Sequence, residues 1–135
     1  MQDTYNINNT ISFIGLGKLG LPLATIFAKN NVDVIGIDKN ENIINSLNKN
    51  KAPFYEKGLQ KNLNQSNKNI TYTTDYSGIV KKSDISIILV NTQIGKSYSS
   101  EYVVSAITDL CNELKNSDKV YHLFILSSTV LPGET

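Results

Sequence analysis

The hydrophobic residues of this chain recur with two alternating spacings. Short, β-branched apolar runs predict buried strands, and apolar residues three or four positions apart predict amphipathic helices between them. Strands are expected at residues 11–14, 32–37, 70–73, 85–90 and 120–126, and helices at residues 19–29, 41–48, 56–64, 75–82 and 101–115. This alternation predicts an α/β fold, a Rossmann-type doubly wound parallel sheet with helices on both faces. We expect the domain to be truncated after about five strands, because no helix follows the last one.

Several side chains have an expected structural role. Asn40 and Asp75 stand where helix N-caps are expected. In the helix at 101–115 one apolar stripe is expected to face the core. That stripe consists of Val104, Ile107, Leu110, Cys111 and Leu114. Cys111 is therefore predicted to be a buried packing residue and not a reactive thiol. Residues 91–100 are expected to form a polar loop, with Tyr98 and Tyr102 packing where the helix begins.

Composition narrows the classes of function. The chain has 135 residues, one domain's worth, with a net charge of +1, so nothing attracts it electrostatically to nucleic acid or an anionic membrane. One cysteine and one histidine, His122, argue against a disulfide framework and a metal centre, and His122 is expected to be structural. No apolar run approaches the roughly twenty residues of a membrane span, and the polar residues 1–10 lack a signal-peptide pattern. These features predict a cytoplasmic protein.

A glycine-rich motif follows the first predicted strand. Gly15-Leu16-Gly17-Lys18-Leu19-Gly20 matches G-x-G-x-x-G and opens the first helix, which is the context that a dinucleotide site requires. The first glycine permits a tight turn, the second lets a pyrophosphate approach the backbone, and the third lets helix and strand pack closely. The helix N-terminus supplies N–H donors and about half a positive charge. The plainer alternative is a glycine-rich turn that binds nothing.

An acidic residue ends the second predicted strand. Asp38 lies eighteen residues after Gly20, where a carboxylate takes the hydroxyls of the adenosine ribose. Such a carboxylate repels a 2′-phosphate, and the thirteen basic residues are all lysines, so no arginine is present to accept one. The cofactor predicted is therefore NAD and not NADP, although the adjacent Lys39 weakens the preference.

Two later loops should lie at the same end of the sheet. Val90, Asn91 and Thr92 follow the fourth predicted strand, and Ser128 and Thr129 follow the fifth. Because the carboxyl ends of parallel strands meet at one edge, these groups could reach the ribose, the nicotinamide or a catalytic water.

Taken together, these motifs resemble the N-terminal NAD-binding domain of the UDP-glucose/GDP-mannose dehydrogenase family of nucleotide-sugar 6-dehydrogenases. The matching segments cover nearly the whole chain in the family's order. They are Phe13-Ile14-Gly15-Leu16-Gly17-Lys18-Leu19-Gly20-Leu21-Pro22-Leu23-Ala24, Asp38, Pro53, Glu56-x-Gly58-Leu59, Thr74-Asp75, Asp84, Val90-x-Thr92 and Ser128-Thr129-Val130-x-Pro132-Gly133. The Glu-x-Gly-Leu and Ser-Thr-Val-x-Pro-Gly segments are much more specific than the glycine motif.

The resemblance implies an enzyme that oxidises the C6 alcohol of a UDP-sugar to the uronate in two NAD-dependent steps, for polysaccharide biosynthesis. It implies that residues 15–20, Asp38 and Lys39, Val90 to Thr92, and Ser128 contact the cofactor, and that Thr129 also orders the catalytic water. Residues 1–135 would be the N-terminal part of a homodimeric enzyme. The substrate domains and the cysteine nucleophile lie further along such enzymes, so this chain alone is expected to be inactive.

Two departures and two alternatives accompany the resemblance, and the milder departure is that Leu131 and Glu134 vary the end of the later motif. The family's Val-Pro-Thr-Pro is replaced by Val90-Asn91-Thr92-Gln93, which predicts a less constrained loop. A β-hydroxyacid or 6-phosphogluconate dehydrogenase would share the glycine motif, but it lacks the Glu56-x-Gly58-Leu59 segment. A non-enzymatic NAD-sensing module would fit the length but would leave Ser128 to Gly133 unexplained.

Overall fold

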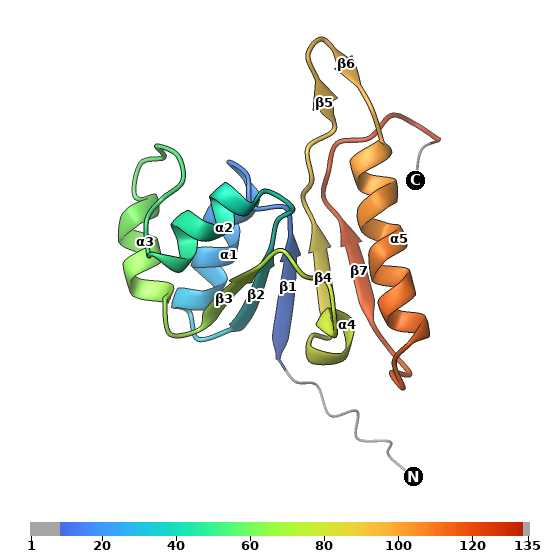
Figure 1. The fold of residues 1–135 in the computed structure, drawn as a ribbon, viewed down its shortest axis with the longest axis horizontal. Coiled ribbons are helices and arrows are strands. Elements are labelled where there is room, and N and C mark those ends of the chain that lie inside the picture. The colour runs from blue at the N-terminus through green and yellow to red at the C-terminus, as the bar shows by residue number, and fades with distance from the viewer. Residues whose placement is uncertain (1–8, 134–135) are drawn as a thin grey trace.

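A computed structural model describes residues 9–133 of the chain. Five strands form one parallel sheet in the order β3-β2-β1-β4-β7 (Figure 1). They are β1 (Thr10–Ile14), β2 (Asp33–Ile37), β3 (Ile70–Thr73), β4 (Ile85–Ile88) and β7 (Leu123–Leu126). The strand order reverses direction between β1 and β4, which is the topological switch point of a Rossmann-type fold. The predicted fold class is confirmed.

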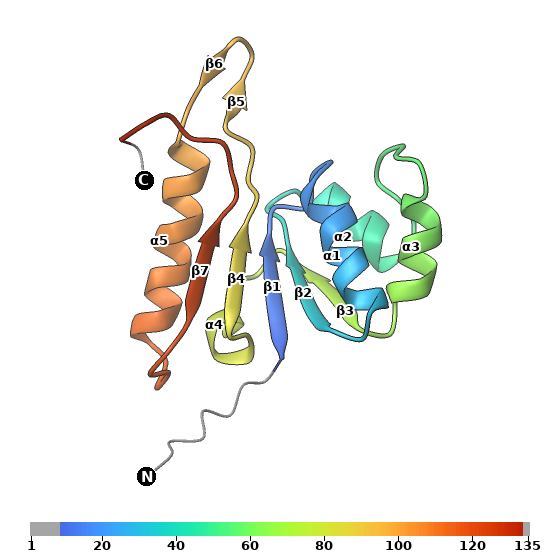
Figure 2. The same ribbon diagram turned by 180° about the vertical axis from the view of Figure 1, so that it is seen from behind.

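Helices cover both faces of this sheet. They are α1 (Gly20–Lys29), α2 (Glu41–Asn48), α3 (Leu59–Ser66), α4 (Ile79–Lys82) and α5 (Glu101–Lys115). One core cluster joins Phe13 of β1 to α1, α2 and α3, and a second joins Ile14 of the same strand to α4 and α5. Because neighbouring residues of a strand point to opposite faces, β1 contributes to both cores. Figures 1 and 2 show α1 to α3 grouped beside β1 to β3, whereas α5 lies along β7.

The outermost part of the sheet is less well covered. Leu123 and Ile125 of β7 alternate with Phe124 and Leu126, which pack toward the α4 and α5 core. Leu123 and Ile125 therefore point to the other face and are 39% and 38% exposed. Within residues 9–133, the structure contains no helix with the length and apolar character needed to cross a membrane.

Two helices begin later than the sequence pattern predicts. The expected cap of α4, Asp75, lies four residues before the helix, which starts at Ile79. Its Oδ1 instead accepts the Ser77 N–H at 2.8 Å. Hydrogen bonds from the side chain and the backbone of Ser77 lower the pKa of Asp75. Gly78, at φ 71°, then separates this turn from the helix. The prediction that Asp75 caps a helix was wrong because its side chain stabilises a local turn. Gly58, at φ 83°, similarly delays α3 to Leu59.

Helix α5 is rotated by one residue from the orientation that the sequence predicts. Its buried side chains are Val103, Ala106 and Leu110, whereas Val104 and Ile107 are 58% and 37% exposed. The prediction was right for Leu110, which is fully buried, and for Leu114, which packs against the same core, but wrong for Val104 and Ile107, whose places are taken by Val103 and Ala106. Cys111, which lies on the mispredicted stripe, is only partly buried.

The segment expected to be a polar loop contains a small hairpin. Its strands β5 (Gln93–Ile94) and β6 (Ser97–Tyr98) are antiparallel and extend beyond the end of β4 (Figure 2). The Asn91 side chain bonds twice to Gln93, accepting its N–H and donating to its carbonyl, each at 3.0 Å. The Ser99 N–H donates to the Thr92 carbonyl at 2.8 Å and closes the hairpin. These hydrogen bonds link residues 91–93 to one another and to Ser99.

Candidate functional site

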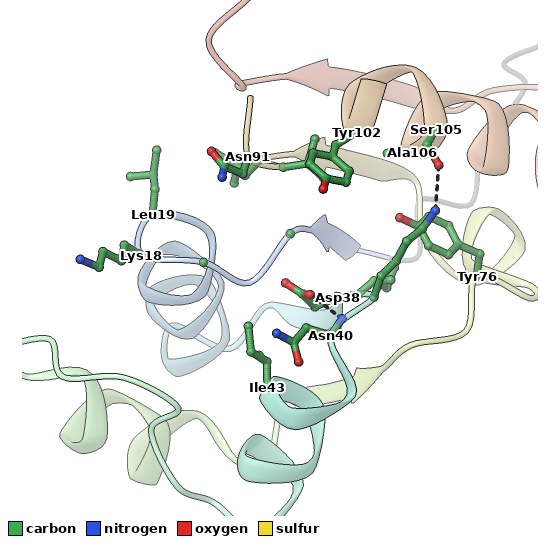
Figure 3. Close-up of a pocket in the computed structure, with 16 residues that line it drawn as sticks. Lys18, Leu19, Asp38, Asn40, Ile43, Tyr76, Asn91, Tyr102, Ser105 and Ala106 are labelled. Atoms are coloured by element: carbon green, nitrogen blue, oxygen red, sulfur yellow. Dashed lines mark hydrogen bonds between the residues drawn. The ribbon is translucent and has the colours of Figure 1, made fainter. Parts of the chain in front are cut away.

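An open cleft of about 730 Å³ lies at the carboxyl ends of the central strands, between the glycine-rich loop and α5 (Figure 3). This is the edge where ligands bind in sheets of this topology. Eight of the predicted site residues line it. They are Gly15, Gly17, Lys18, Leu19, Asp38, Lys39, Val90 and Asn91.

The three glycines of the loop differ in what surrounds them. A Cβ on Gly15, which has φ 98°, would lie 2.6 Å from the Leu89 carbonyl oxygen, and one on Gly20 would lie 1.9 Å from the Gly15 carbonyl oxygen. Both glycines are therefore required by the packing of the protein itself. A Cβ on Gly17 would have nothing within 4 Å, although Gly17 lines the cleft. The protein's own packing does not require a glycine there, and the open space suits a group that must approach the backbone.

Asp38 connects the end of β2 to the glycine-rich loop. Its Oδ2 accepts the Leu16 N–H at 2.8 Å, and its Oδ1 accepts the Asn40 N–H at 2.9 Å. Figure 3 shows the Asp38 carboxylate beside Asn40, with its oxygens toward the cleft. The two N–H donors fix the orientation of this carboxylate, which leaves it placed to accept hydrogen bonds from a ligand hydroxyl.

The far wall of the cleft is built by α5 and by Tyr76. Lys39 reaches this wall: its Nζ lies 2.8 Å from the Ser105 Oγ, 3.0 Å from the Asp109 Oδ2 and 5.7 Å from the centre of the Tyr76 ring. Burial, followed by the charges of Asp109 and Asp38, raises the pKa of Tyr76 to about 12. Tyr76 is therefore a neutral wall of the cleft at physiological pH.

The remaining predicted residues are not among those that line the cleft. Leu16 is fully buried in the core and Thr92 is 7% exposed, while Thr129 is exposed beyond the end of β7. The Ser128 hydroxyl donates to the Val90 carbonyl at 2.8 Å, and its N–H donates to the Ile88 carbonyl at 3.1 Å. The later motif therefore adjoins the end of β4 without entering the cleft.

Half of the residues that line the cleft were not predicted from the sequence. The additional residues are Ile37, Asn40, Ile43, Tyr76, Leu89, Tyr102, Ser105 and Ala106. Ile37, Asn40 and Leu89 adjoin predicted strand ends, so the sheet topology could have indicated them. Tyr102, expected only to pack, lies over the cleft in Figure 3. Ser105 and Ala106 depend on the rotation of α5, which the pattern did not resolve.

A second polar cluster lies in the amino-terminal half of the sheet, under α4 and α5. The Ser86 Oγ is hydrogen-bonded to the Ser12 Oγ at 2.6 Å and to the His122 Nε2 at 2.8 Å, and Ser83 donates to Ser12 at 3.2 Å. All three serines are fully buried. Burial, followed by the charge of Lys119, lowers the pKa of His122. The structure therefore places His122 among buried hydroxyls and not in the cleft.

Comparison with known proteins identifies relatives of this domain. The sequence model of the UDP-glucose/GDP-mannose dehydrogenase family, NAD binding domain, matches residues 9–135. A GDP-mannose 6-dehydrogenase of Pseudomonas putida is 33% identical over 127 residues, which cover 91% of this chain and 29% of that protein.

Solved structures show the same relationship. A ternary complex of GDP-mannose dehydrogenase from Pseudomonas aeruginosa superposes with a TM-score of 0.85 at 31% identity, over 91% of this chain and 29% of that one. A UDP-glucose dehydrogenase from Pyrobaculum islandicum also gives 0.85, at 28% identity, over 93% of this chain and 30% of that one. The chain therefore spans less than a third of the length of these relatives.

Proposed function

The chain belongs to the UDP-glucose/GDP-mannose dehydrogenase family, and on this basis we propose that it is the NAD-binding part of a nucleotide-sugar 6-dehydrogenase. NAD is the cofactor of this domain, and when bound it accepts the hydride that leaves the substrate carbon. The observation that carries the proposal is the open space over Gly17, which shares one cleft with the Asp38 carboxylate.

The glycine-rich loop is proposed to hold the pyrophosphate. Gly17, Lys18 and Leu19 line the cleft directly before α1, so the N-terminus of this helix opens toward it. Backbone N–H groups and the partial positive charge of a helix N-terminus both favour a bound anion. We assign Gly15 and Gly20 the role of shaping the loop, and Gly17 the role of admitting the phosphates to the backbone.

Asp38 is proposed to bind the adenosine ribose. Its carboxylate is already oriented by the Leu16 and Asn40 N–H groups, so it can accept from the 2′- and 3′-hydroxyls without reorganising. The same charge would repel a 2′-phosphate, and the chain has no arginine to offset that repulsion. This accounts for NAD as the cofactor.

The loops after β4 and β7 are proposed to meet the nicotinamide half of NAD. Val90 and Asn91 line the cleft, and the Ser128 hydroxyl joins the β7 loop to Val90, so the two loops adjoin. We assign Thr92 and Ser128 positions beside the nicotinamide half of bound NAD. Thr129, which is exposed at this edge, is assigned to contact NAD and to order the catalytic water, as the family resemblance implies.

The substrate is proposed to be a nucleotide sugar, with a UDP-sugar as our specific prediction. Its C6 alcohol would be oxidised to a carboxylate in two two-electron steps, each reducing one NAD, with water supplying the second oxygen. Substrate binding and the cysteine nucleophile are assigned to other segments of a longer, homodimeric cytoplasmic enzyme, since this chain matches only 29% of its Pseudomonas putida relative. Family membership disfavours the β-hydroxyacid dehydrogenase alternative.

Calorimetric titration of the chain with NAD and NADP tests this proposal. We expect NAD to bind more tightly than NADP, and Asp38→Asn to weaken NAD binding about tenfold through loss of charge-assisted hydrogen bonds. Asp33→Asn removes an exposed carboxylate at the opposite end of β2 and is the matched control. Tighter binding of NADP by the unmodified chain would contradict the assignment of Asp38. We also expect the chain alone not to oxidise UDP-sugars, and turnover would contradict the assignment of the thiol to another segment.

A further inference from the structure

Lys39 directly follows the proposed ribose-binding residue, yet its ammonium group is attached to the opposite wall of the cleft. The Nζ atom donates to the Ser105 Oγ at 2.8 Å and lies 3.0 Å from the Asp109 Oδ2, both on α5. Figure 3 shows Ser105 and Tyr76 on this side, with the dashed hydrogen bond ending on Ser105. The side chain thus bridges the end of β2 and the middle of α5.

The location of this cation matters for the choice between NAD and NADP. NADP carries its additional phosphate on the ribose hydroxyl that Asp38 is proposed to bind. Basic side chains near this point of the fold are the groups that accept that phosphate. Lys18 and Lys39 are the cations that line the cleft, and Lys18 belongs to the glycine-rich loop. If Asp38 binds the ribose as proposed, Lys39 is the lysine adjacent to the 2′ position, and the direction of its side chain decides whether it can serve a 2′-phosphate.

We propose that Asp109 is a positioning residue for cofactor selectivity, because it holds Lys39 on α5 and so keeps its ammonium from the 2′ position of the adenosine ribose. The inference rests on the NAD site proposed above. Asp109 acts through Lys39 and does not itself contact the cofactor. The two side chains are 57% and 37% exposed, so the ion pair is partly solvated. Removing the Asp109 carboxylate leaves Lys39 with neutral partners, the Ser105 hydroxyl and the Tyr76 ring, which compete less well for its ammonium group with a phosphate.

The ratio of the dissociation constants of NAD and NADP, measured by calorimetry on the full chain, tests this role. Asp109→Asn removes the charge at nearly constant shape. It is expected to shift the ratio toward NADP by about fivefold, the size that a partly exposed ion pair supports. Asp109→Glu keeps the carboxylate and is expected to retain the unmodified ratio. Asp33→Asn controls for loss of one negative charge elsewhere on the chain and is expected to leave the ratio unchanged.

Repeating the measurement in a Lys39→Met chain distinguishes an effect that acts through Lys39 from a general effect of charge. Loss of any carboxylate near the cleft favours the more anionic NADP, whereas the proposed mechanism requires the released lysine. In a Lys39→Met chain, adding Asp109→Asn should therefore produce no further shift. A shift that persists in this background, or no shift in Asp109→Asn alone, overturns the proposal. Failure of the unmodified chain to bind NAD would instead refute the cofactor site itself, so the two outcomes are distinct.

Discussion

The two ends of this parallel sheet both carry polar side chains, but the two sets are paired differently. In the amino-terminal half, Ser12, Ser86 and His122 hydrogen-bond to one another beneath α4 and α5. At the carboxyl end, Asp38 and the loop around Gly17 line an open cleft. In the first set the Ser12 and Ser86 hydroxyls and the His122 Nε2 have partners within the protein, while the buried His122 Nδ1 has no hydrogen-bond partner among the described residues. The second set offers donors and acceptors to a ligand. This difference, and not the presence of polar residues, separates structural from functional positions in this domain.

The two ends of the sheet also differ in how their polar groups contribute to stability. A buried hydroxyl loses its hydrogen bonds to water on folding, so it contributes to stability only if protein partners replace them. The serine cluster meets this condition with three fully buried hydroxyl groups. The cleft residues retain access to solvent and can exchange water for a cofactor. We therefore expect substitutions at the two ends to divide cleanly between effects on stability and effects on NAD affinity.

The largest effect is expected at the centre of the serine cluster. Ser86→Ala removes the partner of the His122 Nε2 and one of the partners of Ser12, whose hydroxyl keeps its contacts with Ser83 and the Ile85 carbonyl. The His122 Nε2 is then left without this hydrogen bond in the interior. We expect the free energy of unfolding to fall by about 2 kcal/mol. Urea denaturation followed by circular dichroism measures this change.

The control for Ser86 lies in the hairpin. Ser97→Ala alters an exposed serine of β6 and should leave the unfolding free energy within about 0.5 kcal/mol of the unmodified value. NAD affinity of the folded Ser86→Ala chain should remain unchanged, because the cluster lies at the other end of the sheet. Equal destabilisation by both substitutions would show that the serine cluster has no special structural role.

In contrast to Ser86→Ala, Gly17→Ala is expected to lower NAD affinity while leaving stability nearly unchanged. Its Cβ would enter open space, so stability should hardly change, but the methyl group would occupy the approach to the backbone. We expect NAD affinity to fall about tenfold, which corresponds to about 1.4 kcal/mol. Calorimetry of NAD binding and thermal unfolding, measured on the same sample, separate the two quantities.

Gly20→Ala is the matched comparison in the same motif. Its Cβ would lie 1.9 Å from the Gly15 carbonyl oxygen, so this substitution should lower both stability and NAD affinity. If Gly17→Ala also destabilised the fold, the space over Gly17 would be required by the protein rather than by a ligand.

The sequence predicted the features that depend on local pattern and backbone geometry. Strand and helix order, the Asn40 cap of α2, and the placement of Gly17 and Asp38 at one edge follow from periodicity, capping chemistry and the G-x-G-x-x-G motif. The rotation of α5 did not follow, because Val103 and Ala106 are buried in place of Val104 and Ile107, and tertiary packing rather than apolar periodicity selects between them. That rotation places Ser105 at the cleft and decides the partner of Lys39, so this wall of the site could not be predicted.

His122 provides the smallest and most selective test of the comparison between the two ends. Burial and Lys119 lower its pKa in the folded state, so below its unfolded pKa of about 6.5 the unfolded chain binds the proton more readily. The contribution of neutral His122 to the free energy of unfolding should therefore be fully present above about pH 6.5. It should decrease as the pH falls toward the folded-state pKa. His122→Gln removes this titration, and its unfolding free energy should change less between pH 7.5 and 5.5.

Because His122 is the single histidine of the chain, the difference between these two pH profiles isolates one group. Urea denaturation at each pH measures it, and both profiles are compared above pH 5, where the lowered pKa of Asp75 keeps that carboxylate charged. Parallel profiles would show that the environment of His122 does not disfavour its charged form. Over the same range, His122→Gln should leave the pH dependence of NAD affinity unchanged, since the cleft lies at the opposite end of the strands. A change in that dependence would link the two ends and remove the separation drawn between them.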